Sequence, residues 1–183
     1  MKDTDKIFDG FLVLQYQSGY KKAMNLLVKR HHDKLCKQAY WYTRDIDTAK
    51  DIVQDCWSIL INKLDTLKDP NLFSSWATRI VIRKSLDYLK KEKRNKEKIQ
   101  FFSENIENED GVSDKSNEVL QLIKAIELLP LNQREVLQLF YTQEYSLKEI
   151  SQILEISIGT VKSRLFHARE KLKALINNND MSI

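Results

Sequence analysis

Apolar residues recur at helical spacing along almost the whole chain, and no stretch alternates in the way that a strand would. In the first half the pattern predicts helices at about residues 7–17 and 20–42, with Asp47 or Thr48 as the cap of a third. A fourth is expected from Ser74 to about residue 91 or beyond. Breaks fall near Gly19 and at residues 43–45 and 68–71. The expected core positions of the third and fourth helices are Ala49, Ile52, Val53, Cys56, Trp57, Leu60 and Ile61, and Trp76, Ala77, Ile80, Val81, Tyr88 and Leu89.

The second half of the chain predicts four shorter helices, at residues 119–129, 132–142, 146–154 and 158–176. The last two have the pattern of a helix-turn-helix. Ser146 and Glu149 have the spacing of a capping box, Ile156 is expected to plug the turn, and Ser157 is a second N-cap candidate. The inward positions are Leu147, Ile150, Ile153 and Leu154, then Val161, Leu165 and Leu172.

Charge makes the last helix more informative than its apolar pattern alone. Residues 157–174 hold five basic residues and one acid, a local net charge of +4. A basic helix with a polar outer face fits the major groove of duplex DNA when it is the second helix of a helix-turn-helix. The alternative is an ordinary basic surface helix.

A second basic segment follows two aromatic residues. Residues 79–98 hold nine bases and three acids, a net charge of +6, directly after Phe73 and Trp76. Unpaired bases stack on aromatic rings, at ~1–3 kcal/mol per base, while cations follow the phosphates. The alternatives are that Trp76 belongs to the core and that the cationic run is a solvated helix end. Together the two basic segments indicate a protein that both finds and opens a DNA site.

Composition supports an all-α fold and sets limits on function. The 183 residues include only four Gly and two Pro, which argues against a sheet with many tight turns. Residues 100–118 hold six acids and one base, and they are too polar to offset their ordering entropy. We therefore predict two small helical domains, residues 1–94 and 118–183, joined by a flexible acidic linker at residues 95–117.

The cysteine pattern predicts neither a metal site nor a cofactor. Cys36 and Cys56 have no zinc-ligand spacing, and His32 with Cys36 lacks a second pair. Both cysteines are expected to be thiols of a reducing compartment. The charged N-terminus, the short apolar run at residues 11–14 and the lack of ~20 consecutive apolar residues predict a cytoplasmic protein with no membrane insertion.

Four ordered motifs resemble the bacterial RNA polymerase sigma factors of the extracytoplasmic-function group, over most of residues 20–176. They are residues 51–57 (DIVQDCW), 73–80 (FSSWATRI), 128–137 (LLPLNQREVL) and 158–169 (IGTVKSRLFHAR). Each motif is weak alone, but their order and spacing together are highly specific. The resemblance implies that the first domain is the family's region two and the second its region four.

The resemblance also implies partners and contact residues. The helix with Asp51, Gln54 and Asp55 is expected to bind the clamp coiled coil of the polymerase largest subunit, with the flap as a second polymerase contact. The loop at residues 66–72 is expected to accept a flipped base of the minus-ten promoter element, and the last helix to read the minus-thirty-five element. An anti-sigma factor is a further expected partner. The minus-ten candidates are Asp69, Asn71, Phe73, Trp76, Arg79, Arg83 and Lys84; the minus-thirty-five candidates are Thr160, Lys162, Ser163, Arg164, Phe166, His167 and Arg169.

Three residues depart from the family pattern, and two other classes of protein remain as alternatives. Many relatives have Asn at Arg83 and Arg at His167, which predicts a more electrostatic strand contact and weaker or pH-dependent duplex binding. Helix-turn-helix proteins often have Gly in the turn where this chain has Glu155, which predicts a reshaped turn. The first alternative is a stand-alone helix-turn-helix regulator, which would need a dimer face. The second is a nucleic-acid-processing enzyme, in which Asp51 and Asp55 would bind Mg²⁺, but the chain offers no partnering acidic motif. We therefore predict a promoter-specificity subunit that is not an enzyme.

Overall fold

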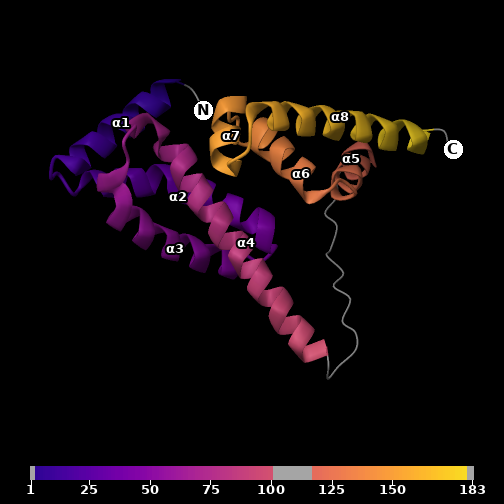
Figure 1. Ribbon diagram of the computed structural model, residues 1–183, viewed down its shortest axis with the longest axis horizontal. Helices are drawn as coiled ribbons and strands as arrows, with labels where there is room; N and C mark the ends of the chain where they lie inside the picture. The colour runs from indigo at the N-terminus through magenta and orange to yellow at the C-terminus, as the bar shows by residue number, and fades with distance from the viewer. Residues whose placement is uncertain (1–2, 101–116, 181–183) are drawn as a thin grey trace. The chain divides into compact units, whose positions relative to one another are not determined.

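The computed structural model describes residues 3–100 and 117–180, and the regular structure of these residues is entirely helical (Figure 1). The chain divides into two compact units, Met1–Asn105 and Ile106–Ile183. The first holds α1 to α4 and the second α5 to α8. The prediction of an all-α fold with two small helical domains is confirmed. Most of the predicted linker, residues 101–116, lies outside the described residues.

Residues 3–100, the described part of the first unit, form four helices and two short 3-10 turns. They are α1 (Asp3–Gln17), α2 (Ala23–Thr43), α3 (Ile46–Lys63), η1 (Leu64–Thr66), η2 (Pro70–Leu72) and α4 (Phe73–Gln100). The cap of α3 differs from the prediction, since Asp45 and not Asp47 or Thr48 begins the helix. Arg44 ends α2 in the left-handed conformation, with φ 55°, and the Asp45 carboxylate accepts a 2.7 Å hydrogen bond from the Thr48 backbone N–H. The helix therefore starts immediately after the turn.

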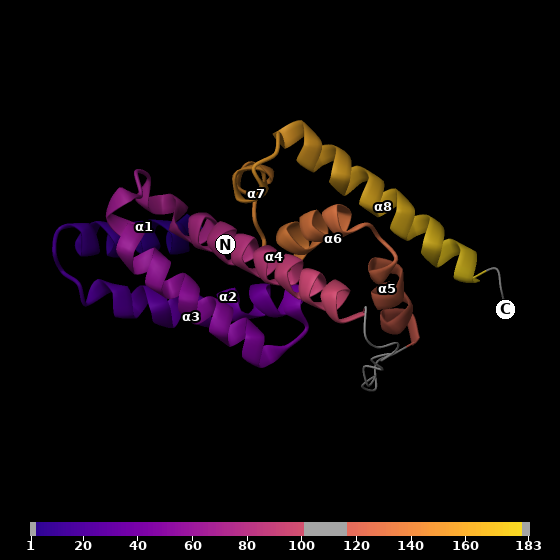
Figure 2. The ribbon, with the colours of Figure 1, turned by 60° about the horizontal axis from the view of Figure 1, so that its bottom comes forward.

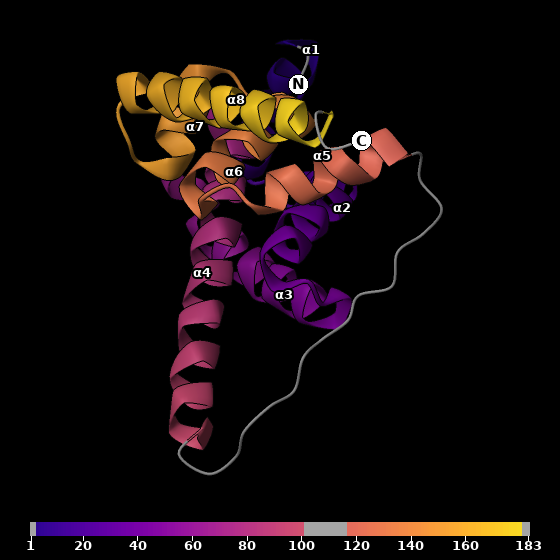
Figure 3. The same ribbon diagram turned by 90° about the vertical axis from the view of Figure 1, so that its right-hand side faces the viewer.

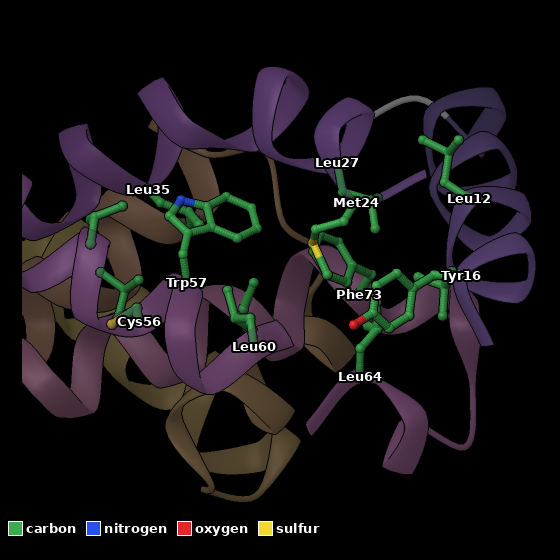
Figure 4. Packing of buried hydrophobic residues seen from close by; sticks show 14 of the residues in the cluster. Leu12, Tyr16, Met24, Leu27, Leu35, Cys56, Trp57, Leu60, Leu64 and Phe73 are labelled. Atoms are coloured by element: carbon green, nitrogen blue, oxygen red, sulfur yellow. The ribbon is translucent and has the colours of Figure 1, made fainter. Parts of the chain in front are cut away.

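One apolar core joins the four helices of this unit. Helices α2, α3 and α4 run beside one another (Figure 2). Figure 4 shows Tyr16, Met24, Leu27, Leu64 and Phe73 gathered toward the α1 side of the core. Six of the seven core positions predicted for α3 are buried: Ala49, Ile52, Val53, Cys56, Trp57 and Leu60. The prediction for Ile61 is wrong, since this residue is 41% exposed. Ile61 lies at the edge of the apolar stripe, on the side of the helix that faces solvent.

The long helix α4 extends well past the rest of its unit (Figures 1 and 3). Its first half packs on α2 and α3, with Ala77, Val81 and Ile82 buried and Trp76, Ile80 and Tyr88 partly buried against the core. The helix continues to Gln100, six residues past the predicted domain boundary. Residues 90–98 are almost all Lys, Glu and Arg, residue types with high helix propensity.

A buried ionic cluster fastens α1 to α2. The Asp9 side chain is 1% exposed. One Asp9 oxygen accepts a 2.8 Å hydrogen bond from Arg30 Nε, and the other lies 2.8 Å from His31 Nε2. Arg30 also donates to Asp5 at 3.1 Å, and its guanidinium lies 4.9 Å from the Phe8 ring centre. Burial alone raises the pKa of Asp9, but the hydrogen bonds and charges of His31 and Arg30 outweigh it, so this pKa lies below its ordinary value.

The lowered pKa of Asp9 predicts that the cluster stabilises the unit at neutral pH and less so in acid. A carboxyl with a depressed folded-state pKa contributes stability above its unfolded pKa and loses it as the pH falls through the folded value. Asp9→Asn should therefore lower the free energy of unfolding by about 1–3 kcal/mol at neutral pH. Urea unfolding should be followed by tryptophan fluorescence, since all three tryptophans, Trp41, Trp57 and Trp76, lie in this unit. The difference from wild type should narrow near pH 3; an equal difference at both pH values would contradict the assignment.

The second unit is a four-helix arrangement that ends in the helix-turn-helix. Its helices are α5 (Asn117–Glu127), α6 (Leu131–Leu137), α7 (Leu147–Leu154) and α8 (Ile158–Asp180). The helix predicted at residues 132–142 changes at Gln138–Thr142 into a π-helical turn. The periodicity of apolar residues does not separate one wide turn from an α-helix, so the sequence did not show it. Among the described residues of this unit, the buried hydrophobic ones are Ala125, Leu129, Val136, Leu137, Leu139, Tyr145, Ile150, Ile153, Val161, Leu165 and Ala168.

Candidate protein and nucleic-acid interfaces

The side of α3 that faces away from the core carries the first candidate interface. Asp51, Gln54 and Asp55 are all exposed. Ser58 and Ile61 continue the same helical face, at the three- and four-residue steps that place side chains above one another. We call these five residues the α3 outer face. It offers two carboxylates and one exposed apolar side chain, the latter missed by the sequence analysis because Ile61 was assigned to the core.

The loop between α3 and α4 carries the next two candidates, Asp69 and Asn71. Both residues are exposed. The Asp69 carboxylate accepts a 3.1 Å hydrogen bond from the Asn71 backbone N–H and so begins η2, with Pro70 as its first residue. This Asp-Pro-Asn sequence therefore folds into a short turn in which both residues remain exposed.

The start of α4 requires one correction. Phe73 has no exposed surface; its ring meets the His31 ring edge-on, with 5.1 Å between the ring centres. The prediction that Phe73 contacts DNA directly is therefore wrong for this structure, because the tertiary core covers it completely. Trp76, with its ring centre 6.2 Å from that of Phe73, is half-buried and packs against the core.

Farther along α4, basic side chains share the exposed side of the helix. Arg83 and Lys84 are exposed and Arg79 is half-buried. Arg79 and Arg83 are one turn apart, so their charges lie above one another along the helix. Trp76 is three residues before Arg79, so the half-buried ring lies about one helical turn from the cations.

The helix-turn-helix is built by local hydrogen bonds that the sequence predicted. Ser146 and Glu149 form the capping box: the Glu149 backbone N–H donates to Ser146 Oγ at 3.3 Å, and the Ser146 backbone N–H donates to Glu149 Oε2 at 2.9 Å. Ser157 caps α8 by accepting a 3.0 Å hydrogen bond from the Thr160 backbone N–H. Both predicted caps are confirmed.

The turn itself adopts the strained geometry expected of Glu155. This residue has φ 55°, in the left-handed region that glycine usually occupies, and its backbone N–H donates to the Ser151 carbonyl. The Ile156 N–H donates to that carbonyl too, at 3.1 Å, and the Ser151 hydroxyl donates to the Ile156 carbonyl at 2.6 Å. Ser151 thus holds the turn closed from both directions and fixes the start of α8.

Val161, Leu165 and Ala168 form the buried side of helix α8. Five of the seven minus-thirty-five candidates are exposed: Lys162, Ser163, Phe166, His167 and Arg169. Thr160 and Arg164 are half-buried, and the Thr160 hydroxyl lies 2.8 Å from Ser157 Oγ. Lys162, Phe166 and Arg169 follow one another at four- and three-residue steps and form one stripe along the helix.

Two aromatic residues that the sequence analysis passed over support Arg169. Its guanidinium carbon lies 5.8 Å from the centre of the Phe140 ring and 5.5 Å from that of Tyr141. The two rings are nearly perpendicular, and Tyr141 is 58% exposed. These rings belong to the π-helical turn, so no α-helical spacing linked them to α8.

Metal ligands, thiols and apolar helices are the remaining features of the described part of the chain. Across residues 3–100 and 117–180 no three His, Cys, Asp or Glu side chains gather as metal ligands. Cys36 and Cys56 are free, and burial raises the pKa of both thiols, that of Cys56 to about 12. Within the same residues, no helix has the length and apolar character that a bilayer crossing requires.

These features define a class: a two-domain helical factor whose second domain has a helix-turn-helix. Comparison with known protein families identifies the particular one. Residues 27–95 match the family described as sigma-70 region 2, and residues 120–172 match sigma-70 region 4. The chain therefore belongs to the sigma-70 family, in the extracytoplasmic-function group. It is an RNA polymerase sigma factor, not an enzyme, and the resemblance noted in the sequence is confirmed.

Two sigma factors align with this chain over nearly their whole length. RNA polymerase sigma factor SigV of Bacillus subtilis is 28% identical over 166 residues, 88% of this chain and 96% of SigV. The ECF RNA polymerase sigma-E factor of Escherichia coli K12 is 29% identical over 181 residues, 92% of this chain and 94% of that protein.

Two solved structures have a similar fold. The first is the sigma factor RpoE of Bartonella quintana in complex with the anti-sigma factor NepR, with TM-score 0.68 and 22% identity over 85% of this chain and 98% of RpoE. The second is CnrH in complex with the cytosolic domain of CnrY, with TM-score 0.66 and 25% identity over 93% of this chain and 97% of CnrH.

Proposed function

We propose that the two units of this sigma factor divide its work between polymerase, unpaired DNA and duplex DNA. The α3 outer face binds the clamp coiled coil of the polymerase largest subunit. The α3–α4 loop and the exposed side of α4 hold the unpaired minus-ten strand, and α8 reads the minus-thirty-five duplex. The observation that carries the proposal is that one chain combines an exposed acidic helix face with a capped, cationic recognition helix.

The proposed domain organisation follows the same division. Residues 1–94 bind core polymerase and melt the minus-ten element, residues 118–183 read the minus-thirty-five element and contact the flap, and residues 95–117 link them. When polymerase holds both units, two weak DNA contacts act as one strong bivalent contact. Lysine and arginine contacts to phosphate make the affinity salt-dependent, and base contacts in the major groove supply ~1–3 kcal/mol each of sequence choice.

Melting requires only binding energy on this proposal. Extruding a base from the duplex costs a few kcal/mol, and stacking with pocket contacts offsets that cost. The half-exposed Trp76 supplies a ring surface, and Arg79, Arg83 and Lys84 supply charge for the phosphates. The surrounding polymerase supplies the chemistry of RNA synthesis.

We also propose that the protein works in the cytoplasm and is held inactive by an anti-sigma factor. The proposal is supported by the similarity to CnrH, whose structure was solved with the cytosolic domain of CnrY. The composition, with 31% charged residues, fits an aqueous compartment.

Transcription with purified components tests the proposed function. Core polymerase should be incubated with fragmented genomic DNA of the source organism, with and without this protein, and the RNA 5′ ends should be mapped by sequencing. We expect a small set of new start sites that share two conserved elements upstream and that appear only when the protein is present. An unchanged set of start sites would contradict the proposal.

A further inference from the structure

Helix α1 lies along the loop that joins α3 to α4 (residues 64–72; the α3–α4 loop), as Figures 1 and 2 show. The Gln17 side-chain amide donates one hydrogen bond to the Leu64 carbonyl, at 2.9 Å, and another to the Leu67 carbonyl, at 3.1 Å. The neighbouring Tyr16 hydroxyl donates to the Ile61 carbonyl at 3.3 Å, just before the loop. The C-terminal end of α1 therefore binds the backbone carbonyls of the first half of the loop.

The other end of the loop rests on α1 at a glycine. A Cβ atom on Gly10 would lie 2.5 Å from Asn71 Oδ1 and 3.4 Å from the Asn71 backbone nitrogen. Because Gly10 has no side chain, Asn71 can occupy the space beside it. Gly10 and Gln17 are seven residues, or roughly 10 Å, apart along the helix, so α1 supports the loop at two separate points.

Helix α1 is itself fixed beside this loop. Asp9, next to Gly10, binds Arg30 and His31 of α2, and the His31 ring packs edge-on against Phe73. Phe73 is the first residue of α4 and follows the loop directly. Helix α1, which supports the loop, and Phe73, which follows the loop, are therefore both in contact with the same helix, α2.

We propose that α1 is the template that gives the α3–α4 loop its shape, and that Gln17 and Gly10 are positioning residues for recognition of the flipped minus-ten base. This inference rests on the proposed function, in which that loop receives the base. The loop contains only two short 3-10 turns, so it has few backbone hydrogen bonds of its own. A pocket discriminates between bases only if its polar groups are held in place, and here α1 holds them.

Base discrimination by the holoenzyme tests the proposal. Fluorescent single strands carrying the minus-ten element of a promoter found in the transcription experiment should be prepared with each of the four bases at every position. Wild-type holoenzyme should prefer the promoter base at the flipped position by about ten-fold. Gln17→Glu replaces the donating amide with a carboxylate that repels the two loop carbonyls, so this preference should fall to about two-fold, while the preferences at other positions remain.

Matched variants separate positioning from a general loss of structure. Gln15→Glu makes the same chemical change two residues earlier, where the side-chain amide makes no hydrogen bond among the described residues, and it should keep the ten-fold preference. Gln17→Met removes the donor without adding charge, and Gly10→Ala displaces Asn71 while favouring the helix. Both should flatten the preference at the same position, and they decide the question should Gln17→Glu fail to fold.

The outcomes distinguish this inference from the proposed function. Wild-type holoenzyme that shows no base preference at any position would refute the role of the loop in minus-ten recognition. A wild-type preference that survives in Gln17→Met and Gly10→Ala, or that weakens equally at all positions, would overturn the positioning role and leave the proposed function in place.

Discussion

Asp55→Arg should lower the affinity of the protein for core polymerase by about 100-fold or more, with little change in its fold. Asp55 is exposed on the α3 outer face, directly opposite the buried stripe that holds the helix in the core. Exposed substitutions of this kind usually change stability by about 0.5 kcal/mol or less. Close charge pairs across protein interfaces have coupling energies of about 1.5–7 kcal/mol, and reversing one charge turns that attraction into repulsion.

The measurement is the affinity of labelled protein for core polymerase, by fluorescence anisotropy at fixed salt. Asp33→Arg is the matched control, because it makes the same charge reversal at an exposed position of α2 in the same unit. Thermal unfolding of both variants should match wild type. If Asp55→Arg binds core polymerase as tightly as the control does, the α3 outer face is not the polymerase contact.

Lys162→Ala combined with Arg164→Ala should weaken binding of the minus-thirty-five duplex by holoenzyme by about 100-fold, the second large effect. Lys162 is exposed on the first turns of α8, which the Ser157 cap and the Ser151 hydrogen bonds hold in position. Each good contact to a base contributes about 1–3 kcal/mol, and each lost phosphate contact lowers the salt slope by about one.

Duplex binding should be measured over a range of salt concentrations, with Lys173→Ala as control. Lys173 lies on the same helix but pairs with Glu170 at 3.2 Å, so its removal should have a much smaller effect. The single variants then separate the exposed Lys162 from the half-buried Arg164. Transcription and duplex affinity that are unchanged in the double variant would refute α8 as the recognition helix.

Local features were the ones that could be predicted from the sequence. The capping box of Ser146 and Glu149, the cap at Ser157 and the left-handed turn at Glu155 depend on residues within one helical turn of each other. Local hydrogen bonds and backbone preferences determine such features almost completely. The exposed positions of Asp51, Gln54 and Asp55 agree with helical periodicity in the same way, whereas Ile61 was wrongly assigned to the core.

Features that depend on tertiary contacts were missed. Phe73 was predicted to contact minus-ten DNA, yet it is buried against His31, which is 42 positions earlier in the chain. Gln17 was not singled out, because its partners, the carbonyls of Leu64 and Leu67, are 47 and 50 positions away. Periodicity within one helix contains no information about which distant backbone group will lie beside it, and only the folded arrangement supplies it.

The most direct test of the account measures whether this protein, core polymerase or only their complex binds the promoter selectively. A fluorescent promoter fragment should be titrated with this protein alone, with core polymerase alone and with both together, alongside a fragment whose two elements are scrambled. We predict tight, sequence-selective binding only for the combination, with opening of the minus-ten region. Selective binding by the protein alone, together with no measurable affinity for core polymerase, would contradict the account.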